Sequence, residues 1–234
     1  MTSSVKMLKY HARIALKGFW SAAVSGMLIY AAAMILAASL MLRLMTAEAT
    51  TFRLLLIFGI GLILKLLTSL LRAGLINCHL IILRRERPKI SALFAAFRSW
   101  ADRYLFVELI LTAAEALYAG GLILIARSFT GVLLLSALLI WTAAGGILLA
   151  VLSLTLALTT PLFLTDADLS FGDGMRKSAA LMKGQRLRLL RLIISYIGWF
   201  VPAVFTGGLS LLWTTPYLLQ STCGFFREVM DQYR

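Results

Sequence analysis

Charged side chains are scarce in this chain of 234 residues: Asp, Glu, Lys and Arg together make up only 14% of it. Soluble globular domains average about 25% charged and about 45–50% apolar residues. Here 61% of the residues are apolar, which is more apolar surface than a water-facing core of this size can bury. The composition therefore excludes a soluble single-domain enzyme.

Histidine and cysteine are also scarce, with two residues of each. Cys78, Cys223, His79 and His11 show neither C-x-x-C nor H-x-x-x-H spacing, so the sequence predicts no metal site and no cofactor. Two histidines leave no Ser-His-Asp set, and acid–base chemistry would rest on carboxylates. We therefore expect a protein that is not an enzyme.

Long apolar runs fill most of the chain. A helix needs about 20 mostly apolar residues to cross the hydrocarbon core of a bilayer. Six runs meet this length, at 19–42, 54–76, 104–126, 132–158, 188–206 and 209–229. The last is interrupted by polar residues and by Pro216, so a shallow re-entrant segment is its alternative. The sequence predicts an all-α bundle of six transmembrane helices in one integral membrane domain, 1–234.

Acidic residues number only 10 against 23 Lys and Arg, which gives a net charge of +13. The basic residues collect before the first predicted span, between the second and third, between the fourth and fifth, and after the sixth. The opposite side has only Arg43, Arg53 and Arg127. By the positive-inside rule this predicts that both termini are cytoplasmic. The topology accounts for the positive charge, and nucleic acid is not expected as a partner.

Amphipathic stretches precede each pair of spans, at the start of the chain, at 90–101 and at about 171–182. Their apolar residues recur at helical spacing, which predicts three cytoplasmic helices lying in the membrane interface. Gly18, Asp102 and Gly184 follow these stretches at intervals of 84 and 82 residues. This regularity indicates a threefold repeat of a helix and a hairpin, with units at about 1–86, 87–165 and 166–234. The alternative is that any hairpin membrane protein carries basic loops at intervals.

The second and third predicted spans contain four charged residues, at a depth where charge is costly. Lys65 and Arg72 lie seven residues apart on the second span, and Glu108 and Glu115 lie seven apart on the third. Facing positions on antiparallel helices have a constant sum, which predicts the pairs Lys65–Glu115 and Arg72–Glu108. We favour a clamp that fixes helix packing, and the alternative is a polar pathway within the membrane.

An ordered series of short motifs fills the C-terminal third. Its members are Asp168-Leu169-Ser170, Ser178, Leu181-Met182-Lys183-Gly184-Gln185-Arg186, Ser195-Tyr196-Ile197-Gly198-Trp199, Pro216-Tyr217 and Phe225-Phe226. The series resembles the signature of the bacterial integral membrane family called domain-of-unknown-function 975, and 15–20 fits the opening of that family. The resemblance implies a multi-pass protein of the bacterial cytoplasmic membrane, more distantly similar to the membrane domain of some glycerophosphodiester phosphodiesterases. It implies no catalytic residues.

Basic residues crowd the approach to the fifth span, at the depth of lipid phosphates: Lys183, Arg186, Arg188 and Arg191. Anionic lipid headgroups are their natural partner, although positive-inside anchoring alone explains such a cluster. We therefore expect a non-enzymatic membrane component that binds lipids or a membrane protein complex. The alternative is a small-solute transporter or export partner that uses the charges of the second and third spans.

Overall fold

The computed structural model describes residues 4–45, 51–98, 101–166 and 168–233, and every regular element within these ranges is helical. The elements are α1 (Val5–Leu16), α2 (Trp20–Met45), α3 (Thr51–Leu83), η1 (Ile90–Phe94), α4 (Ala95–Arg98), α5 (Ala101–Ser128), α6 (Gly131–Leu156), α7 (Thr159–Thr165), α8 (Phe171–Leu181), α9 (Arg186–Ile194), α10 (Ile197–Phe205) and α11 (Leu211–Tyr233). The predicted all-α class is confirmed for these residues.

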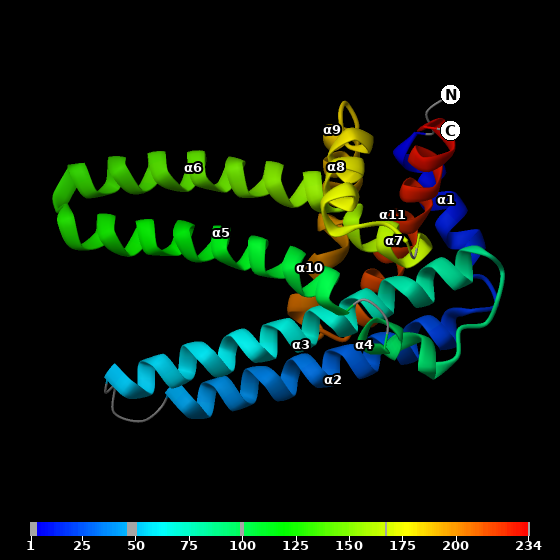
Figure 1. The fold of residues 1–234 in the computed structure, drawn as a ribbon, viewed down its shortest axis with the longest axis horizontal. Helices are drawn as coiled ribbons and strands as arrows, with labels where there is room; N and C mark the ends of the chain where they lie inside the picture. The colour runs from blue at the N-terminus through cyan, green and yellow to red at the C-terminus, as the bar shows by residue number, and fades with distance from the viewer. Residues whose placement is uncertain (1–3, 46–50, 99–100, 167, 234) are drawn as a thin grey trace.

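Two long hairpins, α2–α3 and α5–α6, extend in the same general direction from a packed end of the molecule (Figure 1). We call this end the base; it contains α1, η1, α4, α7, α8, α9 and the C-terminal part of α11. The largest buried side chains lie here, among them Phe163, Tyr196 and Phe225. The hairpins are apolar but exposed along their length, with Leu36 at 71% and Ile140 at 70%. A surface of this kind is suited to lipid and not to water.

Five helical stretches are long and apolar enough to cross a membrane: Trp20–Leu44, Leu55–Leu83, Ala101–Ser128, Gly131–Thr165 and Arg186–Phe205. They support a multi-pass membrane protein and cover the first five predicted spans. The sixth predicted span, 209–229, falls on α11, which is not one of the five. Its polar residues Gln220 and Ser221 are fully buried in the base, so crossing by α11 stays a prediction.

Two of the predicted spans contain breaks. The fourth continues beyond 158, but the helix is interrupted between α6 and α7, and the fifth is interrupted between α9 and α10. Polar side chains bind backbone carbonyls near both breaks: the Ser178 hydroxyl donates to the Thr155 carbonyl at 2.7 Å, and the Lys9 ammonium donates to the Ser195 carbonyl at 2.8 Å. An interrupted helix at membrane depth needs such partners, because no water is present to replace them.

The helix predicted at 90–101 is not one continuous α-helix over the residues that the structure describes, and its place in the membrane interface stays a prediction. The chain forms the short 3₁₀ segment η1 followed by the four-residue α4, and 99–100 lies outside the described residues. The physical reason is close backbone packing on α3: a Cβ at Gly74 would lie 1.6 Å from the Leu93 carbonyl oxygen. The Asn77 amide also donates to the Ala92 carbonyl at 3.1 Å. These contacts hold 90–98 against α3, and the chain there does not continue as one regular α-helix.

The other two amphipathic stretches are helices, α1 and α8. The predicted apolar face of α1, with Leu8, Ala12 and Leu16, is buried in the protein and packs mainly on α11. Helix α8 begins at Ser170, whose hydroxyl accepts a hydrogen bond from the Asp173 backbone at 3.2 Å, as an N-cap does.

Candidate functional site

Two ion pairs join α3 to α5. An Arg72 guanidinium nitrogen lies 2.7 Å from a Glu108 carboxylate oxygen, and Lys65 binds Glu115. Both predicted pairs are therefore present, and the constant-sum rule placed them correctly because α3 and α5 run antiparallel. Glu108 is 7% exposed, whereas half of the Arg72 side chain is accessible. The carboxylate is thus fixed by its partner while the guanidinium keeps free donors.

A cavity of about 410 Å³ opens beside these pairs, between α3, α5, α6, α7, α9 and α11. We call it the span cavity. Its polar lining consists of Arg72, Glu108, Glu115 and four hydroxyl residues, Ser153, Thr159, Thr160 and Thr222. The break between α6 and α7 borders it, since 157–160 lines the wall. The wall of the span cavity thus combines charges, hydroxyls and the interruption between α6 and α7.

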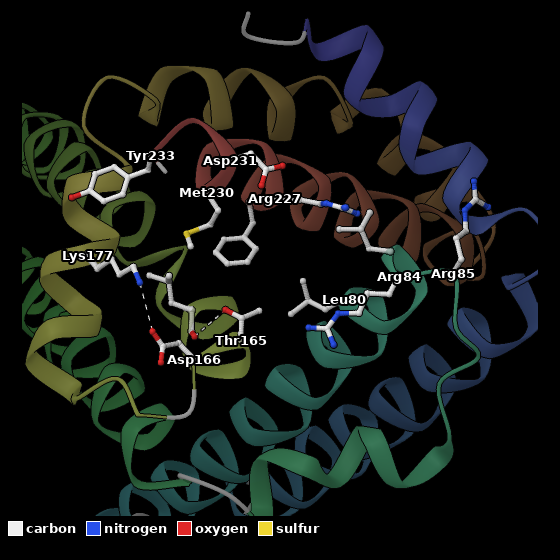
Figure 2. A pocket seen from close by; sticks show the side chains of 13 residues that line it. Leu80, Arg84, Arg85, Thr165, Asp166, Lys177, Arg227, Met230, Asp231 and Tyr233 are labelled. Atoms are coloured by element: carbon white, nitrogen blue, oxygen red, sulfur yellow. Dashed lines mark hydrogen bonds and ion pairs between the residues drawn. The ribbon is translucent and has the colours of Figure 1, made fainter.

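A larger cavity, of about 930 Å³, lies at the base between the ends of α3, α7, α8 and α11 (Figure 2). We call it the base cavity. Its apolar lining comes from Leu80, Leu83, Leu162, Phe226 and Met230, and its charged lining from Arg84, Arg85, Lys177, Arg227, Asp166 and Asp231. Four cations face two carboxylates, so the cavity has an excess of positive charge.

Two of the four cations are held by the protein itself. Lys177 lies 3.6 Å from Asp166, and an Arg85 guanidinium nitrogen donates to the Ile14 carbonyl at 2.9 Å. Sequence reasoning did not assemble the base cavity, because its residues come from four distant segments without common spacing. The basic cluster after the second span was the only signal.

The four predicted headgroup residues do not behave alike. Lys183 and Arg191 are exposed, and Arg186 is partly buried. Arg188 pairs with Glu228 at 2.7 Å and its guanidinium lies over the Phe225 ring, 5.3 Å from the centroid. Both side chains of this pair are less than one-fifth exposed, so Arg188 stabilises the contact between α9 and α11.

A buried pair of polar side chains escaped the sequence reasoning. His79 Nδ1 lies 2.8 Å from Gln220 Oε1, and both residues are fully buried between α3 and α11. Spacing alone could not link positions 141 residues apart. Within the described ranges, no group of three or more His, Cys, Asp or Glu residues is arranged to hold a metal ion.

The chain belongs to the family described as "Protein of unknown function (DUF975)", whose model matches residues 1–232. The resemblance seen in the sequence is thereby confirmed. No curated protein and no solved structure matches the chain.

Two tyrosines of the family motifs, Tyr196 and Tyr217, meet at α1. The rings of Tyr196 and Tyr217 lie edge to face at 5.2 Å, and the Tyr217 hydroxyl donates to the Lys9 carbonyl at 3.0 Å. The Lys9 ammonium lies over the Tyr196 ring, 4.2 Å from its centroid, and donates to the Ser195 carbonyl. Burial lowers the pKa of Lys9. These motif residues therefore fasten α1 to α10 and α11 and line neither cavity.

The remaining motif residues have separate structural positions. Ser178 is fully buried and bonds α8 to α6, and Pro216 is buried within α11. Gly184 has a φ of +80°, and Gly18 has a φ of +90° at the corresponding turn after α1. Asp168 and Trp199 are exposed. The positions of these motif residues indicate roles in the structure of the base and its turns rather than in a reaction.

Proposed function

We propose that the protein is a non-enzymatic component of the bacterial cytoplasmic membrane that binds anionic lipid headgroups at its base. The observation that carries this proposal is the base cavity, in which an apolar lining is combined with an excess of positive charge. A headgroup phosphate is suited to such guanidinium groups, and glycerol and acyl carbons to the apolar lining. The exposed Lys183 and Arg191 extend the same basic surface.

The proposed topology has six crossings with both termini in the cytoplasm. Basic residues gather at the base, whereas Arg43 and Arg127 lie at the far ends of the hairpins. Positive charge on one side of the spans favours a cytoplasmic base. In this arrangement α9 and α10 cross outward and α11 returns, as the third hairpin.

We also propose that the chain contains three related units, 1–86, 87–165 and 166–234. The support is the agreement between the first and third: each has an amphipathic helix, then a Lys-Gly turn with positive φ at Gly18 or Gly184, then an apolar helix. A repeat that always begins on the same side has its axis along the membrane normal.

Lipid binding is tested in nanodiscs that contain phosphatidylcholine with or without phosphatidylglycerol, with retained lipid counted by native mass spectrometry. We expect phosphatidylglycerol to be enriched around the protein. The change of Arg84→Gln with Arg227→Gln should reduce this enrichment by about thirtyfold, as the loss of about 1 kcal/mol for each of the two cations predicts.

The matched control is Arg43→Gln with Arg127→Gln, which removes the same charge at the far ends of the hairpins. It should leave the enrichment unchanged. Equal retention of phosphatidylglycerol by both double variants would refute headgroup binding at the base cavity.

A second function, small-solute transport or export, is favoured by one separate observation: the Arg72–Glu108 pair and Glu115 of the second pair line the span cavity, beside the break between α6 and α7. Lipid enrichment is insensitive to the span cavity. Loss of solute binding on changes at Arg72, with lipid enrichment intact, would therefore favour the second function.

A further inference from the structure

The two cavities are stacked along the same three helices. On α3, Arg72 and Ile76 line the span cavity, and Leu80 and Leu83 line the base cavity. The same succession holds on α7, from Leu158 to Leu162, and on α11, from Cys223 to Phe226 and Arg227. In each case, a residue that lines the span cavity and one that lines the base cavity are three or four positions apart. This separation is about one turn, or about 6 Å, along a helix.

A thin apolar layer separates the cavities. Its side chains are Leu80, Leu162 and Phe226, which are 7%, 0% and 4% exposed and belong to one packed cluster. All three line the base cavity, and the residues one helical turn away, Ile76, Leu158 and Cys223, line the span cavity. We call this layer the septum. One helical turn of apolar side chains is thick enough to exclude water and thin enough to open by side-chain rotation.

The span cavity offers both signs of charge to a ligand. Arg72 has an accessible guanidinium, while Glu115 lies seven residues from Glu108 on α5, about 10 Å along the helix. Hydroxyls from α6, α7 and α11 complete the lining. The base cavity likewise combines cations with Asp166 and Asp231. The charges at the span cavity balance, because Arg72 pairs with Glu108 and Lys65 pairs with Glu115. A ligand that has one anionic group and one ammonium group therefore suits this cavity better than a simple anion does.

We propose that the span cavity binds a small zwitterionic group, which enters from the base through a septum gated by Phe226. This rests on the second function named above and goes beyond headgroup binding. The zwitterion has two sources, a free solute such as glycine or phosphoethanolamine, and the headgroup of phosphatidylethanolamine. Their shared chemistry is an anion on Arg72 and an ammonium toward Glu115.

Cys223 provides the probe, because it lines the span cavity just beyond the septum. In a Cys78→Ser background it is the sole thiol of the sequence. The full chain is placed in phosphatidylglycerol nanodiscs, and the rate at which a charged, membrane-impermeant methanethiosulfonate modifies Cys223 is measured. Phe226→Ala should raise this rate about tenfold, because truncating a buried aromatic side chain leaves a cavity that reagent can cross.

The matched control is Phe225→Ala. Phe225 is 0% exposed, belongs to the same cluster and lines neither cavity. The Phe225→Ala change also removes a buried aromatic ring from the base, but it does not open the septum. The rate of Cys223 modification should therefore stay near that of the unchanged protein. Equal acceleration by both variants, or by neither, would refute the gate.

Ligand chemistry is tested by protection of Cys223 in the Phe226→Ala protein. Glycine or phosphoethanolamine should slow the modification about threefold at about twice the dissociation constant, and acetate and methylammonium should not. Protection should vanish in Arg72→Gln with Glu108→Gln and persist in Arg188→Gln with Glu228→Gln, an ion pair outside both cavities.

The lipid composition of the nanodisc distinguishes the two sources of the zwitterion. Protection without added solute in phosphatidylethanolamine nanodiscs identifies a lipid headgroup, and protection only by added solute identifies a free ligand. Equal protection by acetate, or no protection in either arm, would overturn the zwitterion site. Enrichment of phosphatidylglycerol at the base would be unaffected, so this failure is distinct from failure of headgroup binding.

Discussion

Arg72 and Glu108 provide the most direct test of how charge is accommodated among the spans. Glu108 is 7% exposed, and its carboxylate oxygen lies 2.7 Å from the Arg72 guanidinium. Removing one partner of a buried ion pair costs about 3–5 kcal/mol, because the other charge stays buried without its partner. Half of the Arg72 side chain is accessible, so we expect Arg72→Gln to lower the free energy of unfolding by a smaller amount, about 2–3 kcal/mol.

The double variant Arg72→Gln with Glu108→Gln removes both charges, and the amides can bond to each other. It should be more stable than either single variant, with a coupling energy of about 1.5 kcal/mol or more. Unfolding by sodium dodecyl sulfate in mixed micelles, followed by the fluorescence of the five tryptophans, provides the four free energies. A coupling below about 0.5 kcal/mol would refute the clamp.

The pair of Lys65 and Glu115 allows the effect of burial on the coupling energy to be tested within the same protein. The Glu115 side chain is 56% exposed, and Glu115 lines the span cavity. Water in that cavity can solvate a carboxylate that has lost Lys65. The same cycle on Lys65 and Glu115 should therefore give a smaller coupling than the cycle on Arg72 and Glu108, and a larger one would contradict the burial argument.

Three further outcomes are expected. Gly74→Ala should destabilise the fold by about 2 kcal/mol or more, because its Cβ would meet a backbone carbonyl, whereas Gly59→Ala on the same helix, with nothing within 4 Å, should not; thermal unfolding of both variants measures this. Gly184→Ala, at a φ of +80°, should cost about 1–2 kcal/mol in the same assay. In intact cells, a cysteine at Ser128 should react with an impermeant thiol reagent and one at Ser91 should not, and the reverse pattern would contradict the proposed orientation.

Predictions that depend on local periodicity could be made from sequence, because helices repeat at fixed intervals. The apolar runs located five helices, and the constant-sum rule located both ion pairs. Each of these needs only the pitch of one helix or the antiparallel course of two.

Features that depend on contacts between distant segments could not be predicted. The irregular chain at 90–98 follows from its packing over Gly74, which hydropathy does not record. The breaks near 157 and 195 depend on Ser178 and Lys9 as partners for backbone carbonyls. The two cavities arise only when α3, α7 and α11 are brought side by side.

Because α1 packs on α11, the first helix cannot be buried until the last helix has been synthesised. The Tyr217 hydroxyl binds the Lys9 carbonyl across a separation of 208 residues, and the apolar face of α1 is buried mainly by α11. A nascent chain that has inserted its first two hairpins therefore still exposes the inner face of its first helix. Until α11 leaves the ribosome, that face is available to chaperones and to membrane proteases. A stop codon before 211 would abolish the whole base, not just its last helix, and such a truncated chain should be degraded.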